Sequence, residues 1–127
     1  MSINIKTHLM FEGLAQKAID LYTSAIPNSD VKSIKHYSDG TIEQAHITLN
    51  GNDYMVIDSP VKHEFTFTPA MSIFVTFSEE STLVEVYNIL SAHGNVMMPL
   101  DNYGFSDKFV WFTDQFGVSW QLNMEAE

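Results

Sequence analysis

Histidine is the side chain best suited to proton transfer near neutral pH, and its neutral imidazole is a common metal ligand. The chain contains five: His8, His36, His46, His63 and His93. None of them stands in the H-x-x-x-H spacing that brings two imidazoles together on one helix face. His8 differs from the others because it lies in an apolar, β-branched stretch, where a polar side chain needs a reason. We therefore expect His8 to be the general base if the protein catalyses a reaction.

Other catalytic groups are poorly represented in the chain. Because it has no cysteine, it has no disulfide, thiolate nucleophile or thiolate metal ligand. It also lacks a G-x-S-x-G motif, a G-x-G-x-x-G motif and a Walker loop, so doubly wound nucleotide or S-adenosylmethionine binding has no local support. Asp58, Asp107 and Asp114 end or precede predicted strands, where a base could sit, although loop carboxylates are usually solvated.

The last predicted strand has one apolar and one polar face. The apolar face consists of Val118, Trp120 and Leu122, and the polar face of Ser119, Gln121 and Asn123. The polar face is either solvated or lines a cavity, and the pattern leaves both open. Since neighbouring strand residues point to opposite faces, Trp120 and Gln121 cannot both face a cavity, and we favour Gln121.

Residues 99–112 crowd aromatic side chains around Gly104. The aromatic residues are Tyr103, Phe105, Phe109, Trp111 and Phe112. Such a segment could close over a flat, apolar ligand, because pockets usually combine aromatic walls with a few polar groups. A dimer contact and ordinary core are the alternative interpretations.

The first half of the chain predicts one helix and four strands. Residues 3–11 read as a strand, and the apolar spacing that follows predicts a helix ending at Pro27. Three strands are predicted near 31–37, 42–49 and 53–58. Asn50-Gly51, between the last two, is a strong signal for a two-residue hairpin turn.

The second half repeats this order. A strand over 70–77 precedes a helix that opens with a Thr82-x-x-Glu85 capping box and stops at Gly94. Further strands are predicted near 95–99, 109–113 and 118–123. The sequence therefore predicts an α+β fold in which a β-α-β-β-β module is duplicated.

The length of 127 residues fits a single domain. Within it we expect module one over about 1–62, a linker over about 63–69 and module two over about 70–127. Pro69 supports the linker because proline cannot continue a central strand.

The charge of the chain excludes several classes of partner. Sixteen carboxylates against six lysines, with no arginine, give a net charge of -10, which repels nucleic acid and anionic membrane surfaces. An anionic ligand would have to rely on lysine, histidine or backbone amides. The N-terminal residues do not form a signal peptide, and no apolar run could span a bilayer, so we expect a cytoplasmic location.

Three stretches of the chain carry a family resemblance. The first is Phe11-Glu12-Gly13-Leu14-Ala15 with Ala18, Ile19 and Tyr22. The second comprises Leu49-Asn50-Gly51, Asp58 and His63-x-Phe65-x-Phe67-Thr68-Pro69-Ala70. The third comprises Met98-Pro99-Leu100, Tyr103-Gly104-Phe105-Ser106-x-Lys108-Phe109-x-Trp111 and Asp114-x-Phe116-Gly117-Val118-Ser119-Trp120-Gln121. Together they resemble the PhnB-like family, also called the 3-demethylubiquinone-9 3-methyltransferase domain family.

That family belongs to the vicinal oxygen chelate superfamily of glyoxalases, bleomycin-resistance proteins and extradiol dioxygenases. The resemblance implies two βαβββ modules whose mixed sheets curl into a cup. It puts the superfamily's metal-ligand positions on Gln121, on Ser72, near Asp58 and near Thr7 or His8, depending on the register of the first strand. Serine and glutamine are feeble ligands for a divalent ion, so we expect no complete metal site and no other cofactor. His8, Asp58 and Gln121 are the weak metal candidates.

We therefore expect a PhnB-like homodimer that binds a small apolar or aromatic metabolite in the cup. The residues expected to orient the ligand are His8, Asp58, Ser72 and Gln121. The residues expected to form walls or a lid are Phe67, Tyr103, Phe105, Trp111 and Trp120. The alternatives are a metal-dependent lyase or dioxygenase of the glyoxalase type and a sequestering protein without turnover; methyl transfer is not expected.

Overall fold

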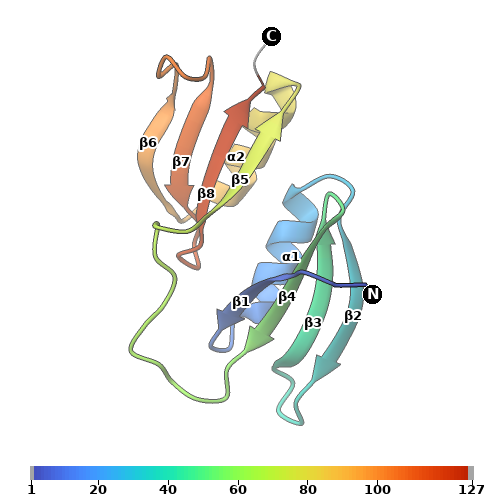
Figure 1. The fold of residues 1–127 in the computed structure, drawn as a ribbon. Coiled ribbons are helices and arrows are strands. Elements are labelled where there is room, and N and C mark those ends of the chain that lie inside the picture. Colours follow the sequence, from blue (N-terminus) through green and yellow to red (C-terminus); the bar gives the residue numbers. More distant parts are fainter. Residues whose placement is uncertain (1, 126–127) are drawn as a thin grey trace. The chain divides into compact units, whose positions relative to one another are not determined.

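The structure is a computed structural model that describes residues 2–125. It divides the chain into two compact units, Met1–His63 and Glu64–Glu127. Each unit has its own sheet and its own helix, and each is described by itself (Figure 1). Whether the two units behave as one domain stays a prediction.

The first unit has one helix lying against a four-stranded sheet. Its elements are β1 (Thr7–Phe11), α1 (Ala15–Ala25), β2 (Asp30–His36), β3 (Ile42–Leu49) and β4 (Asn52–Asp58). The strand order is β1-β4-β3-β2, in which β1 runs parallel to β4 and the other neighbours are antiparallel (Figure 1). Asn50 and Gly51 both have positive φ, 51° and 83°, as a two-residue type I′ turn requires, so the predicted hairpin is confirmed.

The second unit repeats this arrangement. Its elements are β5 (Ser72–Phe77), α2 (Glu80–Ser91), β6 (Asn95–Asp101), β7 (Phe109–Thr113) and β8 (Ser119–Met124). The strand order is β5-β8-β7-β6, and β5 runs parallel to β8 while the other neighbours are antiparallel. The predicted α+β fold of two βαβββ modules is therefore confirmed.

In each unit the helix covers one face of the sheet, and we call the other face the helix-free face. In the first unit the buried residues Leu9 and Val56 lie on the covered face, because α1 packs against β3 and β4. In the second unit Phe112, which is fully buried, lies under α2, with the Tyr87 ring edge-on to it at 5.5 Å. Strand alternation then assigns every other residue to the helix-free face.

Two predicted signals at the ends of the second helix are wrong. α2 begins at Glu80, after Glu79 in an extended conformation, and no side chain caps it, so the Thr82-x-x-Glu85 capping box does not form. At the other end the helix stops at Ser91, and His93, with φ of 62°, takes the left-handed conformation expected of Gly94. Gly94 is required by space instead, because a Cβ there would lie 2.1 Å from the Thr113 carbonyl oxygen.

The first strand is also shorter than predicted, because regular pairing with β4 begins at Thr7 and not at residue 3. Strand β6 extends through Pro99 to Asp101, which is tolerated because β6 is an edge strand and proline need not donate to a neighbour there. Within residues 2–125, no helix combines the length and the apolar character that a membrane span would need.

Candidate ligand-binding face

The helix-free face of the second unit carries a row of neighbouring side chains on four strands. In the sheet register Phe74 of β5 lies beside Gln121 of β8, Gln121 beside Trp111 of β7, and Trp111 beside Met98 of β6. We call these four residues the Gln121 row. Directly opposed side chains on one sheet face have Cβ atoms about 4.5–5.5 Å apart, so the amide of Gln121 is flanked by two aromatic rings.

A chain of hydrogen bonds fixes the polar members of this face. The Trp111 indole Nε1 donates to Ser119 Oγ at 2.9 Å. Ser119 Oγ and Ser72 Oγ are 2.6 Å apart, and either hydroxyl can be the donor. Gln121 Nε2 donates to Ser72 Oγ at 3.1 Å. The network therefore ties three strands together and sets the orientation of the Gln121 amide.

The Gln121 row has the composition of a binding surface for a small apolar molecule. Phe74 is 56% exposed, which is unusual for a phenylalanine in the middle of a strand. The side-chain oxygen Oε1 of Gln121 has no hydrogen-bond partner in the described part of its unit. It can therefore accept a hydrogen bond from a ligand. Met98 and Trp111 are half-buried and add apolar area beside it.

A second aromatic group lies at the loop between β6 and β7. The rings of Tyr103, Phe105 and Phe109 contact one another, with centroids 5.0–6.2 Å apart. The Tyr103 hydroxyl donates to the Pro99 carbonyl oxygen at 2.6 Å, which fastens the loop to its own strand. Phe109 is buried, whereas Phe105 is 68% exposed. The predicted wall residues Tyr103 and Phe105 are thus brought together.

Trp120 lies on the helix-covered face and belongs to the core of its unit. It is fully buried, and its Nε1 donates to Asp114 Oδ2 at 2.9 Å. Asp114 Oδ1 also accepts hydrogen bonds from the backbone amides of Phe116 and Val118. As the alternation predicts, Trp120 and Gln121 point to opposite faces. Phe67, another predicted wall residue, is half-buried in the segment that precedes β5.

The predicted residues of the first unit lie on opposite faces of their sheet. His8 is exposed on the helix-free face, beside Met55 in the register, while Thr7 faces the helix-covered side. Asp58 is 3% exposed, and its carboxylate accepts hydrogen bonds from the backbone amides of Gly13, Ala15 and Ile42 at 2.8–3.0 Å. The role of Asp58 as a ligand-orienting residue stays a prediction, but its observed partners are all backbone groups.

The polar side chains on this face do not fit a divalent metal. Ser72 and Gln121 offer a neutral hydroxyl and a neutral amide, and both already take part in the hydrogen-bond network. In a chain without cysteine, a stable divalent-metal site relies mainly on carboxylate or imidazole ligands, usually three or four of them. Across residues 2–125, no three His, Asp or Glu side chains come together in a way that could hold an ion.

The pKa values of Tyr54 and Asp39 are perturbed, and neither residue belongs to the Gln121 row. Burial on the helix-covered face raises the pKa of the Tyr54 phenol above its usual range. The Thr41 hydroxyl, followed by the Thr41 backbone amide, holds the pKa of the Asp39 carboxyl below its usual range. These shifts concern the structure of the first unit.

Three residues of this face, Ser119, Phe74 and Met98, were not among those expected to contact a ligand. Ser119 carried a signal, because it alternates with Trp120 on the polar side of the last strand. Phe74 carried a weaker signal, because it alternates with Ser72 and Thr76 on the more polar face of its strand, opposite Ile73 and Val75.

The fold agrees with the result of comparison with known proteins. Residues 3–123 match the model of the 3-demethylubiquinone-9 3-methyltransferase family, and the chain belongs to that family. No curated protein matches the chain.

Solved structures extend this result. The chain is similar to a PhnB protein from Bacillus cereus at 46% identity, with 97% of this chain and 100% of that chain covered and a TM-score of 0.94. Protein PA1353 from Pseudomonas aeruginosa is 23% identical, with 99% and 100% covered and a TM-score of 0.82. The fosfomycin resistance protein FosX from Listeria monocytogenes, a complex with Mn(II) and 1S,2S-dihydroxypropylphosphonic acid, is 11% identical, with 99% and 94% covered and a TM-score of 0.66. At that identity the likeness to FosX concerns the fold.

Proposed function

We propose that the protein binds a small apolar or aromatic molecule that carries one hydrogen-bond donor, and that the Gln121 row forms the binding surface. The observation that supports this most directly is the position of Gln121 between Phe74 and Trp111. Flat apolar ligands stack on aromatic rings, and a single oriented amide fixes which end of the ligand faces it. Tyr103 and Phe105 would supply a further wall.

The proposal does not include a metal or a methyl donor. The donor chemistry of Ser72 and Gln121 argues against a divalent ion at these positions, and the chain has no glycine-rich loop for a nucleotide-like cofactor. Elemental analysis of protein purified without chelator tests the first point. We expect far less than one divalent ion per chain, and a stoichiometric metal would overturn this part.

Binding can be tested with 1-naphthol, a flat aromatic probe with one hydroxyl donor, and with naphthalene, which lacks it. We expect 1-naphthol to quench the fluorescence of Trp111 saturably. Replacing the amide in Gln121→Leu should weaken the binding of 1-naphthol about tenfold and the binding of naphthalene less than about twofold. The reason is that the variant loses a hydrogen bond that only 1-naphthol can form. Phe74→Ala should weaken both probes about tenfold.

Val96→Ala is the matched control, because Val96 is 41% exposed and pairs with Phe112, which lies on the helix-covered face. It should bind both probes like the wild type. Absence of saturable binding, or wild-type affinity in both Gln121→Leu and Phe74→Ala, would contradict the proposal.

Two expectations from the sequence, a catalytic role for His8 and a homodimer, belong to the same proposed function. His8 is assigned the role of general base if a bound molecule is turned over, and unchanged turnover in His8→Ala would remove that role. A homodimer is expected in solution, and sedimentation of the wild type as a monomer would remove that expectation.

A further inference from the structure

The helix-free face of the first unit contains a hollow of about 300 Å³. Its lining comes from β2, β3, β4 and the residue that precedes β1: Lys6, Ser33, Ile34, Lys35, Gln44, His46 and Met55. This volume is at the lower end of what small-molecule sites in proteins offer. A ligand of this hollow would therefore be small.

The charge of the lining is opposite to the charge of the chain. The protein carries sixteen acidic residues and only six lysines, with a net charge of -10. Two of those lysines line the hollow, and none of the described residues that line it is acidic. Two ammonium groups lining one hollow of such an acidic chain give it a local positive charge, which favours an anion there.

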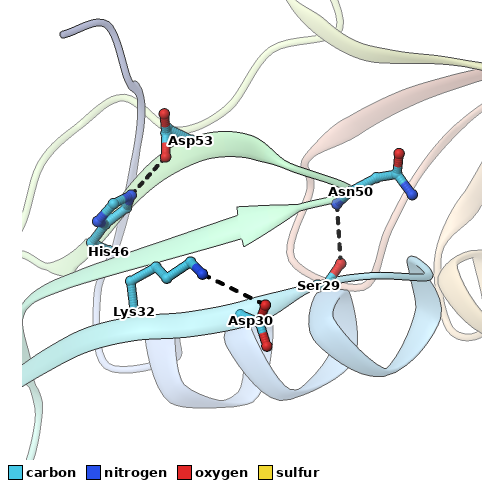
Figure 2. A network of polar contacts seen from close by, with 6 residues as sticks. All are labelled: Ser29, Asp30, Lys32, His46, Asn50 and Asp53. Atoms are coloured by element: carbon cyan, nitrogen blue, oxygen red, sulfur yellow. Dashed lines mark hydrogen bonds and ion pairs between the residues drawn. The ribbon is translucent and has the colours of Figure 1, made fainter.

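The polar groups of the lining are ordered by the sheet. Ser33, His46 and Met55 lie side by side across β2, β3 and β4, and Lys35 lies beside Gln44. The His46 ring is fixed by Asp53, whose Oδ1 lies 2.7 Å from His46 Nε2 (Figure 2). A carboxylate only accepts hydrogen bonds, so Nε2 donates to Asp53, which keeps this acidic group engaged with His46.

Both lysines keep donors for a ligand. Lys35 forms an ion pair with Glu43 at 3.0 Å, but the two side chains are 72% and 36% exposed, and such surface pairs are weak. Lys6 donates to the Asn4 side-chain oxygen. An ammonium has three N–H donors, so each lysine can also bind an anion, together with the Ser33 hydroxyl.

The hollow also has an apolar part, formed by Met55 of β4, which lies beside His46 on the helix-free face. From this combination we propose that the first unit binds a small organic carboxylate, with the carboxylate held between Lys6 and Lys35 and the apolar body against Met55. This site uses none of the residues of the Gln121 row and goes beyond the function proposed for it.

The probe for this site is benzoate, with benzamide as its neutral analogue and inorganic phosphate as an anion without an apolar body. We expect benzoate to shift the backbone amide resonances of Ser33, Gln44 and His46 saturably in a titration followed by NMR. Benzamide and phosphate should bind at least about fivefold more weakly. Benzamide or phosphate binding as tightly as benzoate, or shifts confined to other residues, would overturn the proposal.

The matched variants test the two ammonium groups. The double variant Lys6→Met, Lys35→Met should bind benzoate about tenfold more weakly than the wild type. Added salt should also weaken the binding of benzoate to the wild type. Lys32→Met is the control, because Lys32 lies on the same strand as Lys35 but pairs with Asp30 and does not line the hollow (Figure 2). All three lysines are at least partly exposed, so the variants should fold, which their circular dichroism would show. Equal weakening by Lys32→Met, or wild-type affinity in the double variant, would overturn the proposal.

Discussion

Asp58 illustrates how a carboxylate can be fully engaged in holding the fold. It is the last residue of β4, and its two oxygens accept hydrogen bonds from the backbone amides of Gly13, Ala15 and Ile42. Ala15 is the first residue of α1, and Gly13 precedes Leu14, the N-cap residue, which offers no side-chain cap. Asp58 therefore supplies, from a distant strand, the capping that helix starts usually receive from a neighbouring residue.

We expect Asp58→Ala to destabilise the protein by about 3–4 kcal/mol, because three backbone donors lose their acceptor, two of them in buried positions. Denaturant unfolding of wild type and variant measures the difference. Asp20→Ala is the control, because Asp20 is exposed on α1 and accepts a hydrogen bond from the Gln16 side chain. Its effect should stay within about 0.5 kcal/mol. A loss in Asp58→Ala no larger than that of the control would show that the carboxylate is not structural.

At the scale of the elements, the connection from α2 to β6 depends on close packing. Gly94 lies between the helix and the strand, and a Cβ at this position would meet the Thr113 carbonyl oxygen at 2.1 Å and the Asp114 backbone at 3.1 Å. Both neighbours are backbone atoms, which cannot move aside by a rotamer change.

Gly94→Ala should therefore destabilise the protein by about 2–3 kcal/mol through overpacking, measured as a lower midpoint of thermal or denaturant unfolding. The neighbouring His93→Gly should not destabilise it by more than about 0.5 kcal/mol, because it removes the cost of a left-handed φ of 62° in a residue with a side chain. Equal losses in the two variants would mean that the loop, and not the contact with Thr113, is being perturbed.

Most of the elements could be predicted from the sequence because their signals are local. Alternation, helical spacing and the Asn50-Gly51 turn each concern a few consecutive residues, and the duplicated order follows from them. The predicted capping box does not form because the helix begins earlier, with Glu79 as its N-cap residue, so Thr82 already lies inside α2. The role of Gly94 depends on a contact with Thr113, which no local pattern contains.

The candidate face could be predicted only in part, because it depends on contacts between strands that are distant in the sequence. Gln121 and Trp111 were expected on it, and the structure places them beside each other in the register of β7 and β8. Phe74 shares a strand face with the predicted Ser72, but only the register of β5 with β8 shows that it lies beside Gln121. The hollow of the first unit was also missed, since Lys6 and Lys35 are far apart in the sequence.

The chain as a whole is strongly acidic, with a net charge of -10. A chain that carries many more acidic than basic groups repels itself when it is compact. Two lysine–carboxylate pairs, Lys32 with Asp30 and Lys35 with Glu43, oppose this repulsion, but both are exposed. Pairs of this kind contribute little to the free energy of unfolding.

Screening should therefore stabilise the protein. Raising sodium chloride from about 10 mM to about 150 mM shortens the Debye length from about 30 Å to about 8 Å, which weakens long-range repulsion more than short contacts. We expect the free energy of unfolding to rise by about 1 kcal/mol, which corresponds to a rise of roughly 4 °C in the Tm measured by calorimetry. A variant with Glu79→Gln, Glu85→Gln and Asp107→Asn changes three exposed carboxylates, lowers the net charge from -10 to -7 and should show a smaller salt effect. A Tm that falls with salt would show instead that attractive pairs outweigh the repulsion.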